Sequence, residues 1–248
     1  MEILGALASG VFIGSVLGFV GAGGAMLSVP ILIYFFDYSA INATTASIAV
    51  VIAAATSGLI PKFKSKDVLI KEAITISAIG AVANVGFSTN VHKFNDQFIK
   101  SGFALVLIVA ATLMLVKPVV GSERKVPFLW LFITSIIIGT MTGLFGIGGG
   151  FLAIPILVLF FKNSPVKAAG TSLLIIVLNF TIAFISRHAI WSQVNWKIPI
   201  VMALSAVVIA RLASMKAATV NALVLKRAFA YLLFIISAFT LFQTWITS

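Results

Sequence analysis

The chain has 248 residues, of which 61% are hydrophobic and only 9% are charged. A soluble domain has roughly a quarter charged and somewhat under half apolar residues, so this composition excludes a soluble globular protein and indicates helices that face lipid. The formal net charge is +11, but the cations lie mostly in short loops between apolar segments, which indicates basic cytoplasmic loops rather than nucleic-acid binding.

Ten apolar segments follow one another along the chain, each bounded by polar or basic residues. They predict helices at about 3–20, 25–36, 43–60, 68–90, 98–116, 127–145, 150–161, 166–186, 196–214 and 223–246. Most reach the roughly 17 to 25 residues that a bilayer crossing needs, but 25–36 and 150–161 are too short. The first segment has no basic region before it, so we expect the first helix of the bundle rather than a cleaved signal.

The two sets of five segments repeat each other. Residues 14–60 align without a gap on residues 139–185, at an offset of about 125. The alignment pairs Gly18, Gly21, Gly23, Gly24, Pro30 and Ser47 with Gly143, Gly146, Gly148, Gly149, Pro155 and Ser172. Chance similarity between apolar sequences does not place four glycines and a proline in register. We therefore expect one membrane domain of two repeats, 1–120 and 121–248, as is typical of secondary transporters.

Loop charges distinguish two possible topologies of these repeats. Four simple crossings per half would place nine basic residues on one face and eight on the other, which favours no orientation. A glycine-tipped hairpin followed by three crossings inverts the second half and leaves only four basic residues outside: Lys93, Lys100, Arg187 and Lys197. The cytoplasmic side then holds Lys62, Lys64, Lys66, Lys71, Lys117, Arg124, Lys125, Lys162, Lys167, Arg211, Lys216, Lys226 and Arg227.

The second distribution is the one that the positive-inside rule requires. We therefore predict an all-α integral membrane protein of two inverted repeats, each a glycine-tipped helical hairpin plus three transmembrane helices. Both termini then lie outside. A fully crossing helix pair in place of each hairpin has the same parity and stays an alternative.

The glycine-rich segments 18–24 and 143–150 need a physical reason, because each glycine in a helix interior costs about 1 kcal/mol relative to alanine. Such clusters break a helix or allow very close packing, and the packing reading stays open. If the helix breaks, the short helix that follows aims free N–H groups and its positive dipole end at the tip, which suits a small anion. The candidate binding residues are Gly21, Gly23, Gly24, Ala25, Gly146, Gly148, Gly149 and Gly150.

Polar residues near the tips extend this candidate site. Ser47, Thr171 and Ser172 open the long helices that follow, where they either cap those helices or face the central space. Arg211 is the most deeply placed charge, and it either lines an inner vestibule or extends its side chain to the membrane surface. Asn84 and Asn179 lie deep in apolar helices, where we expect bonds to neighbouring helices, with contact to the substrate as the alternative.

Other chemistry has few residues to support it. The chain has no Cys and two His, both at helix ends, so we expect no disulfide, metal or cofactor. The six carboxylates all lie in or beside loops: Glu2, Asp37, Asp67, Glu72, Asp96 and Glu123. A membrane-embedded enzyme or a buried carboxylate proton relay is therefore not expected.

At these motifs the sequence resembles the sulfite exporter TauE/SafE family, also called the TSUP family. The resemblance rests on the pattern G-x-x-G-x-G-G-x-x-x-x-x-P at 18–30 and 143–155. The segments Ala168-x-x-Thr171-Ser172, Val194-Asn-Trp196 and Ala210-Arg211-Leu212-Ala213 add to it. The resemblance implies a multi-pass permease of the cytoplasmic membrane that exports sulfite, sulfoacetate or related organosulfur anions.

The expected function is alternating-access transport of a small anion around a midplane site made by the two tips, within the lipid bilayer and without a nucleic-acid partner. An inside-negative potential favours anion export by about 2.3 kcal/mol per charge at 100 mV. An anion channel with the same helix-dipole site is the alternative. The halves also differ, because Ala25 stands where Gly150 completes a third glycine, and Thr45-Ala46-Ser47 stands where the second half has Gly170-Thr171-Ser172.

Overall fold

The computed structural model describes residues 2–115, 128–146, 150, 153–154, 157, 165–217 and 222–245. Its helices are α1 (Glu2–Val20), α2 (Gly24–Phe36), α3 (Ala40–Lys64), α4 (Ile70–Thr89), α5 (Asp96–Leu115), α6 (Phe128–Phe145), α8 (Pro165–Ser186), α9 (Lys197–Lys216) and α10 (Ala222–Trp245). Two short 3-10 helices, η1 (Val91–Lys93) and η2 (His188–Gln193), complete the described elements. Each predicted segment except 150–161 matches a helix within a few residues, and 150–161 lies mostly outside the described residues.

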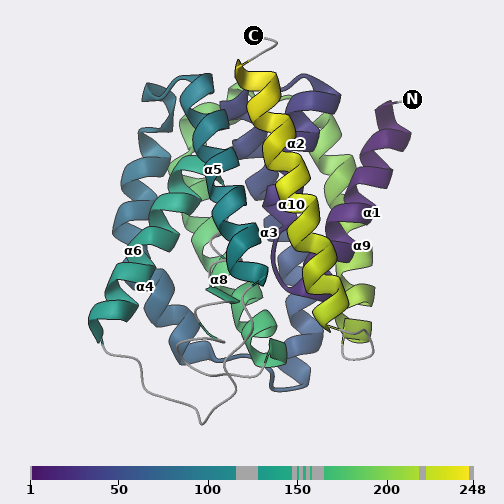
Figure 1. The fold of residues 1–248 in the computed structure, drawn as a ribbon, viewed down its shortest axis with the longest axis vertical. Coiled ribbons are helices and arrows are strands. Elements are labelled where there is room, and N and C mark those ends of the chain that lie inside the picture. Colours follow the sequence, from purple (N-terminus) through teal and green to yellow (C-terminus); the bar gives the residue numbers. More distant parts are fainter. Residues whose placement is uncertain are drawn as a thin grey trace.

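The helices form a bundle that suits a membrane (Figure 1). Within the described ranges, seven helices are long and apolar enough to cross a bilayer, while α2 and the apolar part of α10 are shorter. Large apolar side chains lie on the outside, among them Leu4 (73% exposed), Val82 (80%) and Phe128 (72%). Many of the buried positions hold alanine, serine or threonine instead. Because only lipid stabilises such an exterior, the prediction of an all-α integral membrane protein is confirmed.

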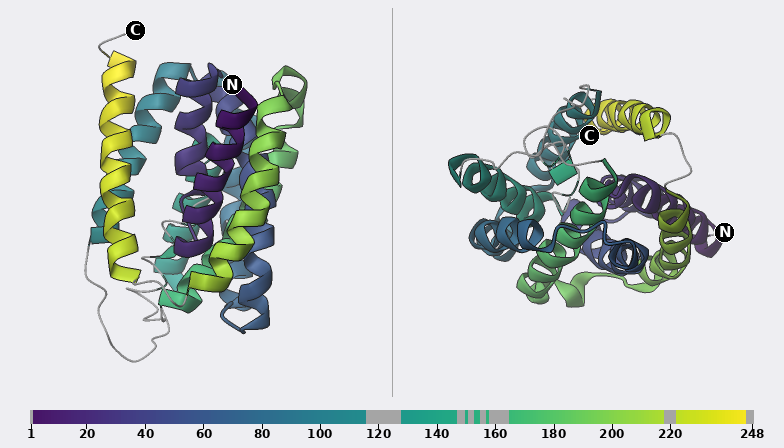
Figure 2. Two further views of the ribbon diagram at one scale, coloured as in Figure 1. Left: turned by 90° about the vertical axis from the view of Figure 1, so that its right-hand side faces the viewer. Right: turned by 90° about the horizontal axis from the view of Figure 1, so that it is seen from below.

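The most extensive packing joins helices of different halves. The helix α1 lies along α9, as Figure 2 shows, and α6 lies along α4. The helix α3 packs on α8 and α9, and α5 packs on α10. Under the repeat offset α1 corresponds to α6 and α9 to α4, so the two largest contacts are equivalent. Each half therefore completes the packing of the other, which agrees with a single domain.

Small residues allow these helices to approach closely. A Cβ added to Gly14 would lie 2.6 Å from the carbonyl oxygen of Ala206, and one added to Gly139 would lie 2.1 Å from that of Gly80. Such distances mean backbone against backbone, the arrangement that small residues permit between membrane helices. These glycines of α1 and α6 serve packing rather than the tips.

Both chain termini lie at the same end of the bundle (Figure 1), which we call the terminal end. At this end a Cβ on Gly5 would lie 3.7 Å from the ring of Phe36, so α2 runs back beside α1 as a hairpin. The indole nitrogen of Trp245 donates to Ser101 Oγ at 3.1 Å, which brings the end of α10 to the start of α5. The hairpin of the first half is thus observed, while the inverted relation of the halves stays a prediction.

Candidate functional site

The first glycine-rich segment breaks the helix, as one reading of the sequence predicts. Helix α1 ends at Val20 and α2 begins at Gly24. Between them Gly21 (φ 76°) and Gly23 (φ 89°) adopt the left-handed conformation, which glycine enters far more easily than other residues. Close packing also applies here, because a Cβ on Gly21 would lie 2.7 Å from Ala169 of α8.

The break leaves the N-terminus of α2 inside the bundle. Residues 21–30 are all buried, and the N-cap residue Gly23 offers no side-chain hydrogen bond to the helix. Helix geometry leaves the first-turn N–H groups of Gly24, Ala25 and Met26 without an acceptor in their own helix. A buried, positive helix end of this kind attracts an anion.

Two serines of the long helices contact the broken segments. Ser47 of α3 shares a hydrogen bond with Ser28 of α2. Ser172 of α8 has its Oγ 2.7 Å from the carbonyl oxygen of Gly21 and 2.9 Å from that of Gly150. The single hydroxyl of Ser172 therefore connects the first tip with a residue of the second glycine-rich segment.

The second tip contacts α3 in a way that matches the first. Gly146 has φ 62°, and a Cβ there would lie 2.8 Å from the carbonyl oxygen of Thr44. At the offset of 125, the pair Gly146 and Thr44 corresponds to Gly21 and Ala169. Each tip therefore rests on the first turns of a long helix from the other half. The predicted site residues Gly148 and Gly149 lie outside the described residues.

Two of the predicted site residues, Thr171 and Arg211, lie away from the glycine-rich tips. The Oγ1 of Thr171 donates to the carbonyl of Lys167 at 2.7 Å and accepts from the N–H of Leu69 at 2.9 Å. It therefore holds the start of α8 against the loop after α3. Arg211 is exposed on α9, while its neighbour in the chain, Ala210, packs on Gly18 of α1. The structure does not bring either residue to the tips.

The two deep asparagines, Asn84 and Asn179, differ in the hydrogen bonding of their side-chain amides. Asn84 of α4 donates to the backbone carbonyl of Asn179 on α8 at 2.7 Å, so the expected helix-to-helix bond is confirmed. The amide nitrogen and oxygen of Asn179 are buried and have no hydrogen-bond partner. Buried polar atoms are nearly always paired in folded proteins, so this amide has unused binding capacity.

Arg187 is a residue that the sequence analysis missed. It follows α8 directly and was expected in an outer loop, but its side chain is only 1% exposed. Its Nη1 donates to the hydroxyls of Thr44 and Thr45, at 2.9 and 3.1 Å. Its Nη2 donates to the backbone carbonyls of Gly143 and Leu144, at 2.6 and 3.2 Å. The repeat held a signal, because the offset pairs Arg187 with Lys62, which is likewise buried (5% exposed).

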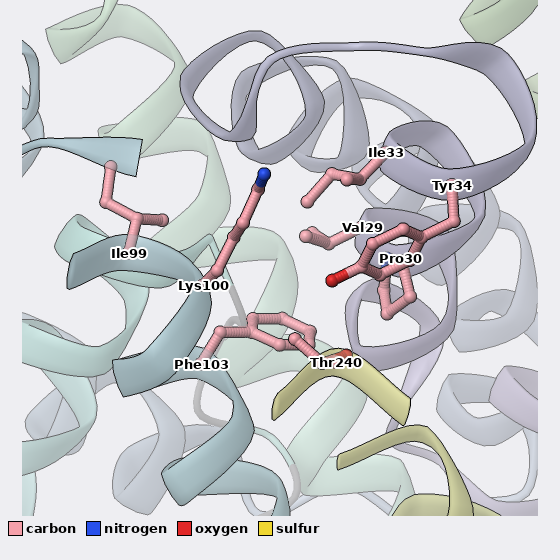
Figure 3. A pocket seen from close by; sticks show the side chains of 8 residues that line it. All are labelled: Val29, Pro30, Ile33, Tyr34, Ile99, Lys100, Phe103 and Thr240. Atoms are coloured by element: carbon pink, nitrogen blue, oxygen red, sulfur yellow. The ribbon is translucent and has the colours of Figure 1, made fainter. Parts of the chain in front are cut away.

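A separate cavity with about 220 Å³ of empty space lies between α2, α5 and α10. Figure 3 shows the side chain of Lys100 and the hydroxyl of Tyr34 turned into it. Its lining residues are Val29, Pro30, Ile33, Tyr34, Ile99, Lys100, Phe103 and Thr240. Most of them are apolar, a lining that suits an apolar group better than a small anion.

One replacement tests the role of Ser172. We expect Ser172→Ala to lower transport about fivefold, because a typical buried hydrogen bond contributes about 1 kcal/mol and the two carbonyls lose the one hydroxyl donor that they share. Initial rates of anion flux in proteoliposomes measure this. Thr181→Ala is the control on the same helix, since Thr181 is exposed and bonds only to its own helix at Val177. Equal rates in the two variants would show that Ser172 has no part in transport.

These features first define a class: an α-helical, multi-pass membrane protein with a helix broken inside its bundle. The chain belongs to the sulfite exporter TauE/SafE family, whose model matches residues 6–240. It is therefore a membrane transporter and not an enzyme, and the family resemblance found in the motifs is confirmed.

Relatives from distant organisms agree with this membership. A probable membrane transporter protein of Xylella fastidiosa (strain Temecula1) is 25% identical, with 96% of this chain and 95% of the relative covered. The probable membrane transporter protein YunE of Bacillus subtilis is 28% identical over 75% of this chain and 78% of its own. The probable membrane transporter protein MJ0441 of Methanocaldococcus jannaschii is 33% identical over 64% and 63%. No solved structure matches the chain.

Proposed function

We propose that this protein is a secondary transporter that exports a small anion, sulfite or an organosulfonate such as sulfoacetate, across the cytoplasmic membrane. The observation that carries the proposal is the buried N-terminus of α2, which begins at a glycine turn and has no side-chain cap. An oxyanion supplies the acceptors that these N–H groups lack. The sulfur chemistry of the substrate comes from the family and not from a particular residue.

The proposed site uses both glycine-rich segments. Gly21, Gly23, Gly24 and Ala25 supply the first side, and Gly146, Gly148, Gly149 and Gly150 supply the second. Ser47 and Ser172 stand beside the tips, where their hydroxyls can turn from the present partners to the anion. Thr171 positions the start of α8, and Arg211 raises the local anion concentration at the surface.

Alternating access follows from the proposed inverted repeats. Each tip rests on the first turns of a long helix of the other half, with Gly21 on Ala169 and Gly146 on Thr44. When one contact opens and the other stays closed, the anion between the tips reaches one side of the membrane at a time. The close contacts at both glycines support an arrangement in which both sides are closed.

Loop charge supports the orientation. Among the residues that the structure describes, the terminal end carries Lys93, Lys100, Arg187 and Lys197. At the other end of the bundle, Lys64 is the last residue of α3, and Lys66 and Lys71 follow it. The positive-inside rule then places the terminal end outside. An anion moving toward that end is driven outward by the membrane potential, by about 2.3 kcal/mol per charge at 100 mV.

Flux measurements in proteoliposomes test this function. We expect labelled sulfite or sulfoacetate to move faster than sulfate, and an imposed potential of the right sign to accelerate net transport. Absence of flux for sulfite, sulfoacetate and thiosulfate under both conditions would overturn the proposal. Planar-bilayer recording separates a carrier from the channel alternative, because single-channel currents would show conduction and no carrier cycle.

A further inference from the structure

We propose that Asn179 and Arg187 bind the anion on its route between the helix tips and the terminal end, and that they select its oxyanion group. This inference rests on the proposed anion transport and deepens it. The sequence did not point to Arg187 as a substrate ligand, and for Asn179 it left contact with the substrate as the alternative to a bond between helices.

Ser172 and Asn179 share one face of α8, and Arg187 follows Ser186, the last residue of that helix. Ser172 and Asn179 are seven residues apart, which is close to two helical turns, so they lie on the same side of α8. Arg187 comes eight residues after Asn179, and the three residues form a stripe that follows the direction of the helix. The tips touch this stripe, because Ser172 bonds to Gly21 and Gly150. Its other end reaches Gly143 and Leu144 through Arg187. The stripe therefore runs from the first tip to the end of α6, beside the second tip.

Among the residues that the structure describes, Arg187 has no anionic partner. All four of its hydrogen-bond partners are neutral hydroxyls or carbonyls, and its buried Nε has none. Burying a cation costs several kcal/mol, and within membranes such residues pair with an opposite charge or with backbone carbonyls; Arg187 has carbonyls but no opposite charge among its hydrogen-bond partners. A transported anion would provide that missing charge. The planar guanidinium also offers paired N–H donors that match two oxygens of a sulfonate, sulfite or carboxylate.

Asn179 adds a donor at the right place along the stripe. Its amide is 0% exposed, and neither its nitrogen nor its oxygen has a partner. At a helical rise of 1.5 Å per residue, Asn179 is about 12 Å along the helix direction from Arg187. In the chain it stands between Ser172 and Arg187. An anion leaving the tips thus meets an unpaired amide first and a guanidinium second. The ligand that suits both the amide of Asn179 and the guanidinium of Arg187 is an oxyanion with two or more equivalent oxygens.

Arg187 also connects the anion to the second tip. Its Nη2 holds the carbonyls of Gly143 and Leu144 at the end of α6, while Nη1 holds Thr44 and Thr45 at the start of α3. An anion at the guanidinium competes with these neutral acceptors. Binding therefore loosens the contact between the second tip and α3, at the place where the outer side would open.

The test compares KM and maximal rate in proteoliposomes for Arg187→Gln, Arg187→Lys and Asn179→Leu. We expect Arg187→Gln to raise KM for sulfite and sulfoacetate at least about thirtyfold, and Arg187→Lys to restore part of the affinity. Asn179→Leu, which is close in volume, should raise KM several-fold. Acetate as a competitor shows whether the site prefers sulfur oxyanions over carboxylates. Lys197→Gln is the control, because Lys197 is an exposed cation at the same end of the bundle.

The outcomes separate this inference from the function itself. No flux in the unchanged protein would count against the transporter proposal. Normal flux there, with KM unchanged in both Arg187→Lys and Asn179→Leu, would overturn the role of this stripe, even if Arg187→Gln failed to fold. A fall in maximal rate at constant KM in all variants would also overturn it, since that result indicates a purely structural role.

Discussion

Replacement of Gly23 by leucine is expected to abolish transport while the protein still folds and inserts. Gly23 has φ 89°, where a residue with a Cβ costs about 1–2 kcal/mol, and its new side chain would stand before the N–H groups of the first turn of α2. We expect flux to fall at least about a hundredfold, the effect that loss of a single oxyanion donor has in buried sites. Initial uptake of labelled anion at matched protein density measures it.

Two further variants separate strain from obstruction at this tip. Gly23→Ala introduces the backbone strain but only a small side chain, so we expect it to retain more flux than Gly23→Leu. Gly86→Leu is the matched control, because Gly86 lies in α4 with nothing within 4 Å of an added Cβ. Gly148→Leu should act like Gly23→Leu if the repeats are functionally equivalent. Normal flux in both Gly23→Leu and Gly148→Leu would show that the tips have no part in substrate recognition.

Replacement of Gly139 is expected to destabilise the whole bundle, in contrast to the tip variants. A Cβ there would lie 2.1 Å from the carbonyl oxygen of Gly80, and neither backbone can yield without moving α6 or α4. We expect Gly139→Ala to cost about 3 kcal/mol or more, at the upper end of overpacking effects. Thermal unfolding in detergent should show a lower Tm, by about 5 °C or more.

The same experiment at Gly14 examines the equivalent contact of α1 with α9. Its Cβ would lie 2.6 Å from the carbonyl of Ala206, so Gly14→Ala should lower Tm as well, by less than Gly139→Ala. Gly86→Ala serves as the control and should leave Tm unchanged or raise it, because alanine is the better helix former. A Tm at the unchanged protein's value for Gly139→Ala would contradict the packing described between α6 and α4.

Much of the candidate site follows from local sequence. The glycine cluster at 18–24 predicted a break or very close packing, because glycine weakens a helix wherever it stands and has no side chain, and Gly21 and Gly23 form a turn. The polar residues were harder to place. Ser172 reaches both tips, whereas Thr171, its neighbour, points to the loop after α3 and Arg211 is exposed. Neighbours on a helix face different directions, so only the packing decides which of them meets the tip.

The amino-acid sequence by itself determined the membrane class, the helix positions and the repeat, because these depend on apolar length, on glycine and on residues in register along one chain. Tertiary structure alone decided that α1 packs on α9 and α6 on α4, since many apolar faces are interchangeable in lipid. It also decided that Arg187 is buried. A basic residue just after a helix has the local pattern of a loop, and only the contacts from α3 and α6 remove it from water.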